Sequence, residues 1–323
     1  MKIRSLAVCL LCFLLLSGAA ATAVEIESVT VSAMTAENGA PVARDLTLTT
    51  YRGVSVGSSF QAVDPEGDLL SYRVTVSPGK GSVTVSGDRF VYTPQAGRRG
   101  RDSFCYQAVD SAGNTSAEAV VDIRLEKLSS QVSYPELAGC SCQYAATRLA
   151  EKGIFIGEKV GGCYCFSPSA VLTRGDFLTM CAALTGMEPL EDVTRTGFYD
   201  DESIRAWQKP YVSAALLYGV VQGSTGDGGK AVFRGDQPIT QAEAAVMLNS
   251  FLEISDTAGF FYTEDVPGWA AQAVANLCAC DICSGEDFHA GRTLTRGDAA
   301  EMLSAALDVL EARGKNSRFS WSQ

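Results

Sequence analysis

The sequence predicts a multi-domain chain, in which an all-β sandwich over residues 38–126 is followed by an all-α domain over residues 139–312. Two observations predict this division. Short segments of alternating apolar and polar residues, separated by Gly, Pro and Asp, fill the first region, as in antiparallel sandwiches. A pattern of helix, turn and capped helix occurs three times in the second region, at spacings of 66 and 62 residues.

Residues 1–23 read as a secretory signal peptide. Lys2 and Arg4 precede an apolar run over residues 6–16, and small residues with an Ala-Thr-Ala cleavage site follow. The run is shorter than the roughly 20 apolar residues that cross a bilayer. We therefore expect cleavage, a leader over residues 24–37, and a secreted chain that is not embedded in a membrane.

The charge of the chain limits its partners. Without residues 1–23 it has 24 basic and 37 acidic residues, a formal charge of −13. This balance argues against nucleic acid, because proteins that bind it present basic surfaces to the phosphates. Binding to any anionic polymer would need a specific site with locally placed Arg or Lys; alternatively, the acidity only keeps an exported protein in solution.

Alternation predicts the strands of the first domain. In residues 69–76, Tyr72, Val74 and Val76 lie on one face and mostly polar residues on the other, which fits a strand with one buried side. Cys105 projects opposite the apolar face of its segment, so we expect an unpaired thiol outside the core. Further alternating segments, bounded by Gly, Pro or Asp turns, lie at residues 83–85, 90–92, 104–108 and 119–125.

A series of phrases runs through this region: NGAPVA from Asn38, DPEGD from Asp64, RFVYTP from Arg89 and GRDSFCYQAVDSAGNTS from Gly100. Through them, residues 38–126 resemble the bacterial Ig-like or cadherin-like modules of surface proteins. The resemblance implies a β-sandwich that acts as a spacer or as an adhesion domain for a surface or host ligand.

Calcium is the one cofactor that the acidic residues of this module suggest. Asp64, Glu66, Asp68 and Asp110 offer the hard oxygen ligands that calcium takes. The same Asp-Pro-Glu-Gly-Asp run is also an ordinary acidic turn, and a single module lacks the neighbour that often completes an interdomain calcium site. The turn is the preferred interpretation, and no cofactor is expected.

Three segments of the second domain share one pattern. Each has two turn residues four positions apart, namely Gly153 and Gly157, Gly219 and Gly223, and Asp281 and Gly285. Trp207 and Trp269 stand 12 residues before the first of these in the second and third copies. We therefore expect a linker at residues 127–138 and a polar tail at residues 313–323. The three repeats between them are expected at residues 139–190, 191–256 and 257–312.

A helix start follows each turn. Thr173, Thr240 and Thr295 are each followed three positions later by Asp or Glu, which predicts a capping box. Apolar residues then recur at i, i+1, i+4 and i+7, one face of an amphipathic helix. One helix pair cannot bury its apolar face alone, so the three copies are expected to share one core.

The middle copy has the fullest motif: Phe198-Tyr199-Asp200, Trp207, Gly219 to Gly223, Phe233 and Thr240-Gln-Ala-Glu. With these residues the C-terminal half resembles the S-layer homology (SLH) repeat. The resemblance implies a pseudo-threefold trimer of helix-loop-helix repeats, whose grooves bind a pyruvylated secondary cell-wall polysaccharide. It assigns Arg174 and Arg296 to the anionic sugar and Trp207 and Trp269 to the groove walls.

The chemistry of these residue types agrees with that assignment. A guanidinium forks to a carboxylate, and an indole offers a flat apolar face to a sugar ring. The alternatives are a solvated surface arginine and a core tryptophan. Gln241 replaces the arginine in copy two, Ser141 the tryptophan in copy one, and Asp281 a glycine in copy three, so binding is expected in the grooves of Arg174 and Arg296.

Nine cysteines follow residue 23, and eight of them lie after residue 139. Cys140, Cys142, Cys163 and Cys165 flank the first helix of copy one, which suggests disulfides in an exported protein. Reduced thiols are one alternative. A zinc site shared with the cysteines of copy three is another, although C-x-C spacing is uncommon in such sites.

The sequence gives little support to an enzyme. A cysteine nucleophile needs a base, and the single histidine, His289, has no Asn or Asp placed for a triad. From both resemblances we expect a non-catalytic cell-surface protein, anchored non-covalently to the cell wall by its SLH repeats. A subunit of a surface array and a cell-wall glycan hydrolase are the alternatives.

Overall fold

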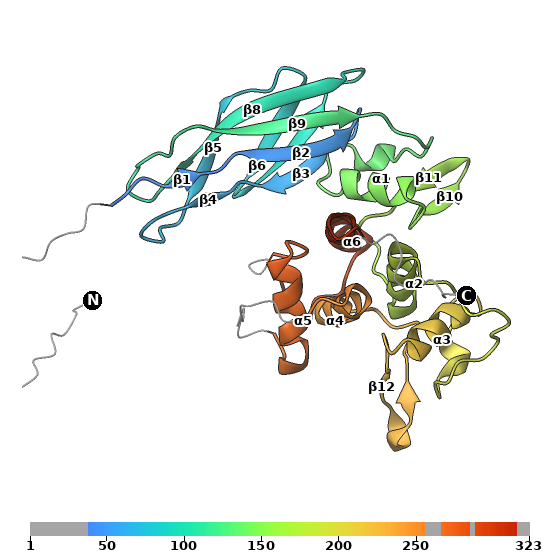
Figure 1. The fold of residues 1–323 in the computed structure, drawn as a ribbon. Helices are drawn as coiled ribbons and strands as arrows, with labels where there is room; N and C mark the ends of the chain where they lie inside the picture. The colour runs from blue at the N-terminus through green and yellow to red at the C-terminus, as the bar shows by residue number, and fades with distance from the viewer. Residues whose placement is uncertain (1–37, 256–265, 285–287, 315–323) are drawn as a thin grey trace, which may run out of the picture. The chain divides into compact units, whose positions relative to one another are not determined.

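The structure, a computed structural model, describes residues 38–255, 266–284 and 288–314. Strands fill the N-terminal part of these residues, and helices dominate the C-terminal part (Figure 1). The predicted signal peptide, the leader and most of the polar tail lie outside the described residues. In the part of the chain that is described, no helix is both long enough and apolar enough to span a bilayer.

Two larger sheets form the sandwich of the N-terminal domain, beside a short antiparallel pair of β1 with β4. One has the order β2-β9-β8-β5 and the other β3-β7-β6. The strands are β1 (Val42–Ala43), β2 (Leu46–Tyr51), β3 (Val56–Ser59), β4 (Ala62–Val63), β5 (Ser71–Val76), β6 (Gly81–Ser86), β7 (Arg89–Pro94), β8 (Gly100–Val109) and β9 (Ala119–Glu126). The prediction of a wholly antiparallel sandwich is wrong for one pair, because β2 and β9 are parallel. They come from opposite ends of the domain, so no short hairpin forces them to run in opposite directions.

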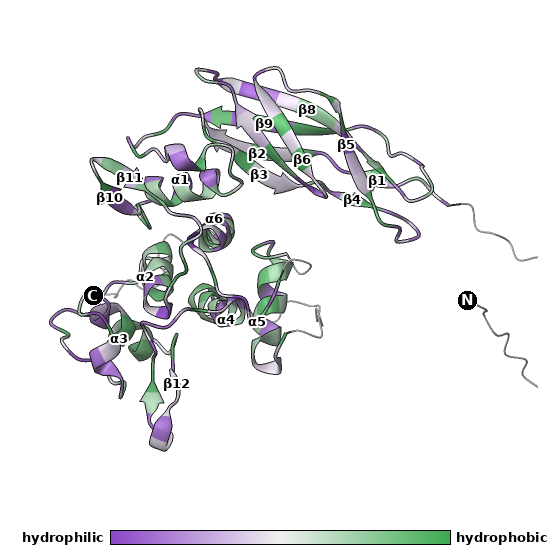
Figure 2. Cartoon of the chain, turned by 180° about the vertical axis from the view of Figure 1, so that it is seen from behind, coloured by the Kyte–Doolittle hydropathy of each residue, from purple (hydrophilic) through white to green (hydrophobic). Residues whose placement is uncertain are grey.

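The sandwich core lies between the two sheets. Alternate residues of β8 and β9 face it, including Phe104, Tyr106, Val121 and Ile123, all at most 1% exposed. Cys105 lies between two of these on the opposite side of β8 and is only partly buried, as the alternation predicted. Figure 2 shows the same mixture of apolar and polar residues along the strands.

The C-terminal part contains six α-helices within the described residues. They are α1 (Gln143–Glu151), α2 (Arg174–Thr185), α3 (Lys209–Leu217), α4 (Gln241–Leu252), α5 (Gly268–Ala279) and α6 (Arg296–Ala312). Short hairpins follow α1 and α3, formed by β10 (Glu158–Val160) with β11 (Cys163–Cys165) and by β12 (Ser224–Thr225) with β13 (Ala231–Val232). Single 3-10 turns lie at Pro135–Leu137, Asp201–Ser203 and Asp227–Gly229.

Helices pair between the predicted copies. The first helix of each copy packs against the second helix of another: α1 against α6, α3 against α2, and α5 against α4. One continuous apolar core contains buried residues from all six helices. The expectation of a shared core agrees with this packing, and three separate helical hairpins do not.

Backbone hydrogen bonds join the three predicted copies in a closed ring. Leu172 donates to the carbonyl of Leu294 (3.0 Å), Leu294 donates to Ile239 (2.9 Å), and Ile239 donates to Leu172 (3.0 Å). Each of these residues immediately precedes a capping threonine and is at most 2% exposed. The ring therefore fixes the starts of α2, α4 and α6 beside one another.

The predicted helix caps form, with one exception. Thr240 and Thr295 make complete capping boxes at the starts of α4 and α6. Thr173 accepts from the amide of Asp176 at the start of α2, but the reciprocal bond is absent. The Asp176 Oδ2 atom accepts from the Thr173 hydroxyl (2.8 Å), and its Oδ1 atom accepts from Arg205 (2.7 Å) and from Gln208 (2.9 Å), which lie just before α3.

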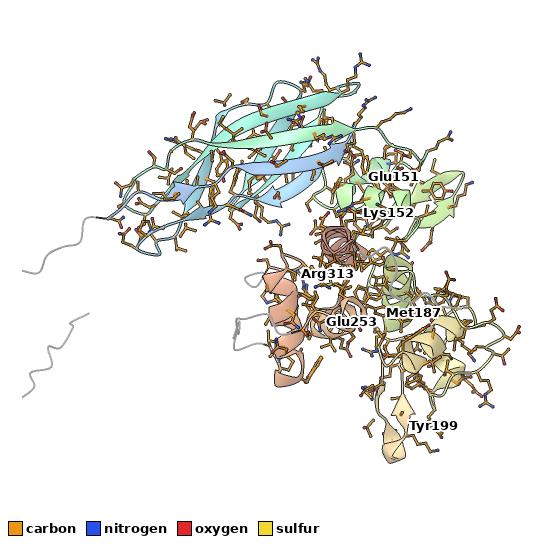
Figure 3. The ribbon with its side chains drawn as sticks, viewed as in Figure 1. Glu151, Lys152, Met187, Tyr199, Glu253 and Arg313 are labelled. Carbon is orange, nitrogen blue, oxygen red and sulfur yellow. The ribbon has the colours of Figure 1, made fainter. Side chains whose placement is uncertain are left out.

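Left-handed residues end several helices. Gly153 and Gly219 have φ of 71° and 70°, and Asp281 adopts φ of 56° at the equivalent position after α5. An L-residue with a Cβ pays a steric cost there that glycine avoids. Glu253 ends α4 in the same conformation, and Arg313 donates to the preceding carbonyl of Leu252 at 2.8 Å (Figure 3).

Candidate functional site

The candidate site is built from the starts of α2, α4 and α6. At each start, two backbone amides that have no partner within the helix donate to the loop of a neighbouring copy. The bonds are Arg174 to Gln237, Gly175 to Gly235, Gln241 to Arg292, Ala242 to Ala290, Arg296 to Ala170 and Gly297 to Pro168, with lengths from 2.8 to 3.2 Å. The side chain of the first residue of each helix is therefore held at a junction between copies.

Arg174 lies at the junction of α2 with the second copy. Its Nε donates to the carbonyl of Phe233 at 3.0 Å, its Nη1 pairs with Glu243 Oε1 at 3.0 Å, and its guanidinium lies over the Phe233 ring. Burial lowers the pKa of Arg174, and the charge of Glu243 opposes that effect. The side chain is 16% exposed. Its Nη2 makes no hydrogen bond to any residue in the described ranges, so it can donate to a ligand.

Arg296 repeats this arrangement at the junction of α6 with the first copy. Its Nη1 donates to the carbonyl of Phe166 at 3.2 Å, and its Nη2 pairs with Glu158 Oε1 at 2.8 Å. The guanidinium lies over the ring of Phe155, and the side chain is 18% exposed. Its buried Nε has no hydrogen-bond partner among the described residues. Both arginines are therefore anchored at junctions, and neither is a freely solvated surface residue.

Gln241 takes the third equivalent position. Its Oε1 accepts from the amide of His289 at 2.9 Å, and the residue is 6% exposed. The amide side chain keeps the contact between copies but carries no charge. The third junction therefore lacks the cation that the other two present.

The tryptophans lie at the surface. Trp207 is 54% and Trp269 62% exposed, so the alternative of buried core residues is wrong for both. Trp269 and Arg174 line one cavity of about 520 Å³ together with Glu243, Val246 and residues 219–224. The structure thus brings one predicted arginine and one predicted tryptophan to the same cavity.

The acidic residues considered for calcium take part in a hydrogen-bonded cluster around two turns. Asn38 Nδ2 donates to Asp68 (3.0 Å) and to Asp110 (3.1 Å), while Asp64 Oδ1 accepts from the amides of Glu66 and Asp68. Asp64 Oδ2 is buried without a partner among the described residues. Within those residues, no group of three or more His, Cys, Asp or Glu side chains could hold a metal ion. Amide groups donate to Asp64 Oδ1, Asp68 Oδ2 and Asp110 Oδ2, which fits a pair of hydrogen-bonded turns, whereas Asp64 Oδ2 has no such donor.

The cysteines form two close pairs. The Sγ atoms of Cys140 and Cys142 lie 3.1 Å apart before α1, and those of Cys278 and Cys283 lie 3.0 Å apart at the end of α5. Cys163 and Cys165 lie in β11. The sequence did not predict that Cys278 and Cys283 form a pair. The turn at Asp281 brings the two residues together, and their spacing along the chain does not reveal this turn.

Comparisons with protein families identify two parts of the chain. Residues 38–127 match the bacterial cadherin-like domain, and residues 197–245 match the S-layer homology domain. The second match falls in the middle copy, which has the fullest motif. No curated protein matches the chain.

Similar solved structures share only part of their length with this chain. An endo-fucoidan hydrolase of glycoside hydrolase family 107 is 25% identical over 28% of this chain and 14% of its own, with a TM-score of 0.24. The SrpA adhesin of Streptococcus sanguinis is 15% identical over 28% of this chain and 58% of its own, with a TM-score of 0.21. The D00-D0 domain of intimin is 16% identical over 28% and 50%, with a TM-score of 0.22.

Proposed function

We propose that this protein is a non-catalytic cell-surface protein, which three SLH-type repeats in a pseudo-threefold arrangement anchor non-covalently to the cell wall. The S-layer homology domain at residues 197–245 supports a wall-associated role. The closed hydrogen-bond ring and the pairing of helices between copies support the threefold arrangement. In this proposal the cadherin-like domain at residues 38–127 is a spacer or adhesion module.

The ligand proposed for the grooves of Arg174 and Arg296 is an anionic secondary wall polysaccharide, with a pyruvyl carboxylate as the recognised group. The observation that carries this is the cavity shared by Arg174 and Trp269. Phe233 and Glu243 fix the guanidinium, so its remaining nitrogen is oriented before the ligand arrives. A carboxylate would accept from Nη2, while the exposed indole would stack on the sugar ring.

Co-sedimentation with purified cell-wall sacculi that retain their secondary polysaccharide tests this proposal. Arg174→Gln and Arg296→Gln are suitable variants, because the chain already has glutamine at the equivalent position 241. A charged hydrogen bond contributes about 1.5–3 kcal/mol, so each change should weaken binding by about 10- to 100-fold. The matched control is Arg124→Gln, which removes an arginine that is 65% exposed on the sandwich and should bind like the unchanged protein.

Walls stripped of the polysaccharide should retain none of the protein. Lysine at both positions keeps the charge but loses the planar fork, so those variants should bind with intermediate affinity. Full retention of a folded double glutamine variant would show that the arginines are not the binding residues. Incubation with walls should cause no loss of turbidity, whereas a glycan hydrolase would clear the suspension.

Self-association separates a spacer from a subunit of a surface array. In analytical ultracentrifugation the chain from residue 24 onward should stay monomeric if the cadherin-like domain is a spacer. Growth of larger species with concentration would favour the array.

A further inference from the structure

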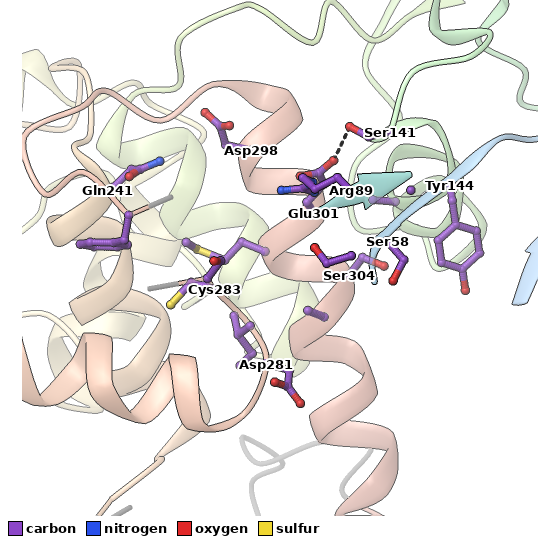
Figure 4. Close-up of a pocket in the computed structure, with 18 of the residues that line it drawn as sticks. Ser58, Arg89, Ser141, Tyr144, Gln241, Asp281, Cys283, Asp298, Glu301 and Ser304 are labelled. Atoms are coloured by element: carbon purple, nitrogen blue, oxygen red, sulfur yellow. Dashed lines mark hydrogen bonds and ion pairs between the residues drawn. The ribbon is translucent and has the colours of Figure 1, made fainter. Parts of the chain in front are cut away.

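The third groove, at the junction of Gln241, differs from the other two in the residues that line it. A cavity of about 700 Å³ lies there, and the sandwich contributes part of its lining through residues 56–59 and Arg89. Figure 4 shows Arg89 close to Glu301 and Ser141, with Ser58 nearby, whereas Gln241 lies on the other side of the cavity. Among the cavities described above, only this one contains residues of both domains.

Ser141 stands at the position of the groove tryptophan and touches β3 of the sandwich. A Cβ placed on Gly57 would lie 2.8 Å from Ser141 Cβ and 3.1 Å from its Cα. The backbone of β3 therefore fills the space into which a tryptophan at position 141 would project. Glycine at position 57 permits this close approach, because any larger residue there would meet Ser141.

Hydrogen bonds and aromatic contacts fasten the sandwich beside the groove. The Gln143 Oε1 atom accepts from the amide of Ser55 at 2.9 Å, and both residues are buried. Ser55 Oγ accepts from the amide of Gly139 at 3.2 Å. Tyr144 packs against the sandwich core and lies 5.7 Å from Tyr51, measured between ring centroids. Separating the domains would break both hydrogen bonds and expose the apolar surface of Tyr144 to water.

The charges of the third groove also disfavour an anionic sugar. Ser141 donates to Glu301 at 2.8 Å, and Arg89 lies 3.8 Å from the same carboxylate. Asp281, Asp298 and Asp308 line the cavity as well, against Arg89 and Arg292. A wall carboxylate would meet more negative than positive side chains, and Gln241 supplies no charge to balance them.

We propose that the third groove does not bind polysaccharide but holds the chain's own cadherin-like sandwich, which is thereby fixed on the helical domain. This proposal explains both departures from the motif. Ser141 replaces the tryptophan because β3 lies against that position, and Gln241 can replace the arginine because no anion binds there. The assignment of the other two grooves rests on the proposed function, whereas the docking of the sandwich does not.

Two variants of the chain from residue 24 onward test the proposal. Ser141→Trp puts a bulky side chain against β3, and Gln143→Ala removes the buried acceptor of Ser55. The control is Ser103→Trp, at an exposed serine on β8. Amide relaxation measured by NMR should give both domains of the unchanged and control proteins one rotational correlation time. In the two test variants the sandwich should show a shorter correlation time than the helices, while its fold is retained.

Sedimentation with wall sacculi is the second measurement. Binding by Ser141→Trp and Gln143→Ala should equal that of the unchanged protein, because this groove takes no ligand. Weakened binding in both folded variants, or independent tumbling of the domains in the unchanged protein, would overturn the proposal. If no form of the protein binds walls but the correlation times change as expected, the proposed function fails and the docking stands.

Discussion

Replacement of Arg148 by methionine should loosen the contact that joins the first and last helices. The Arg148 side chain is 7% exposed, and it pairs with Asp308 at 2.7 Å and with Glu311 at 3.0 Å. Its Nη1 also donates to the carbonyl of Ser304 at 2.9 Å. Methionine keeps most of the apolar stem but leaves this carbonyl and both carboxylates without the guanidinium.

The expected loss follows from the exposure of the partners. Removing one member of a fully buried ion pair costs about 3–5 kcal/mol. Asp308 and Glu311 are 68% and 47% exposed, so water replaces part of the lost interaction. The buried carbonyl of Ser304 keeps the cost above that of a surface pair, and we expect the free energy of unfolding to fall by about 2–3 kcal/mol.

Lys152→Met is the matched control. Lys152 pairs with the same Glu311 at 2.7 Å but is 47% exposed, so its loss should cost at most about 1 kcal/mol. Figure 3 labels Lys152 and Glu151 at the end of α1. Trp207 and Trp269 lie in the helical part and no tryptophan lies in the sandwich, so urea unfolding followed by tryptophan fluorescence reports on the helices. If both changes lowered the free energy of unfolding equally, the buried Arg148 cluster would not be what stabilises the contact between α1 and α6.

Three further outcomes follow from single sites. Although burial opposes it, hydrogen bonding to Lys209 lowers the pKa of Asp201 to about 2, below its usual value. A carboxyl whose pKa is lower in the folded than in the unfolded protein stabilises the fold at a pH above the unfolded pKa, and this contribution should be lost as the pH falls from about 4 to 2. Asp201→Asn should therefore flatten the dependence of the free energy of unfolding on pH in that range. Gly223→Ala should destabilise more than Gly219→Ala in thermal unfolding, because φ is positive at both but only at position 223 would a Cβ meet neighbouring atoms, the nearest at 2.5 Å. With oxidised glutathione as the oxidant, Cys278 and Cys283 should lose two hydrogens and form a disulfide, visible by mass spectrometry of non-reduced peptides; peptides that remain separate and reduced would contradict it.

Local patterns predicted several of the strands and the starts of three helices. Alternation around Phe104 and Tyr106 placed both side chains in the sandwich core and Cys105 on the other side, because successive strand residues face opposite ways. Threonine followed by an acidic residue located the starts of α4 and α6 at Thr240 and Thr295. Such signals depend on neighbours within a few positions, so a single sequence contains them in full.

Contacts between distant parts of the chain were not available from those patterns. The repeats predicted a shared core, but only the structure showed that α1 packs on α6 and that β2 runs parallel to β9. Likewise, the motif selected Arg174 and Trp269 separately, and the tertiary structure placed them in one cavity. Pairings of this kind depend on long-range packing, which no local spacing encodes.

The sequence by itself determined the two kinds of domain, the three helix starts and the residue types at each junction between copies. It also showed that Gln241 and Ser141 depart from the pattern, without a reason for either. Only the tertiary structure decided what the third groove contains, because the approach of Gly57 to Ser141 joins residues more than eighty positions apart. This close approach depends on how the two domains pack. In the sequence its only trace is that small residues stand at positions 57 and 141.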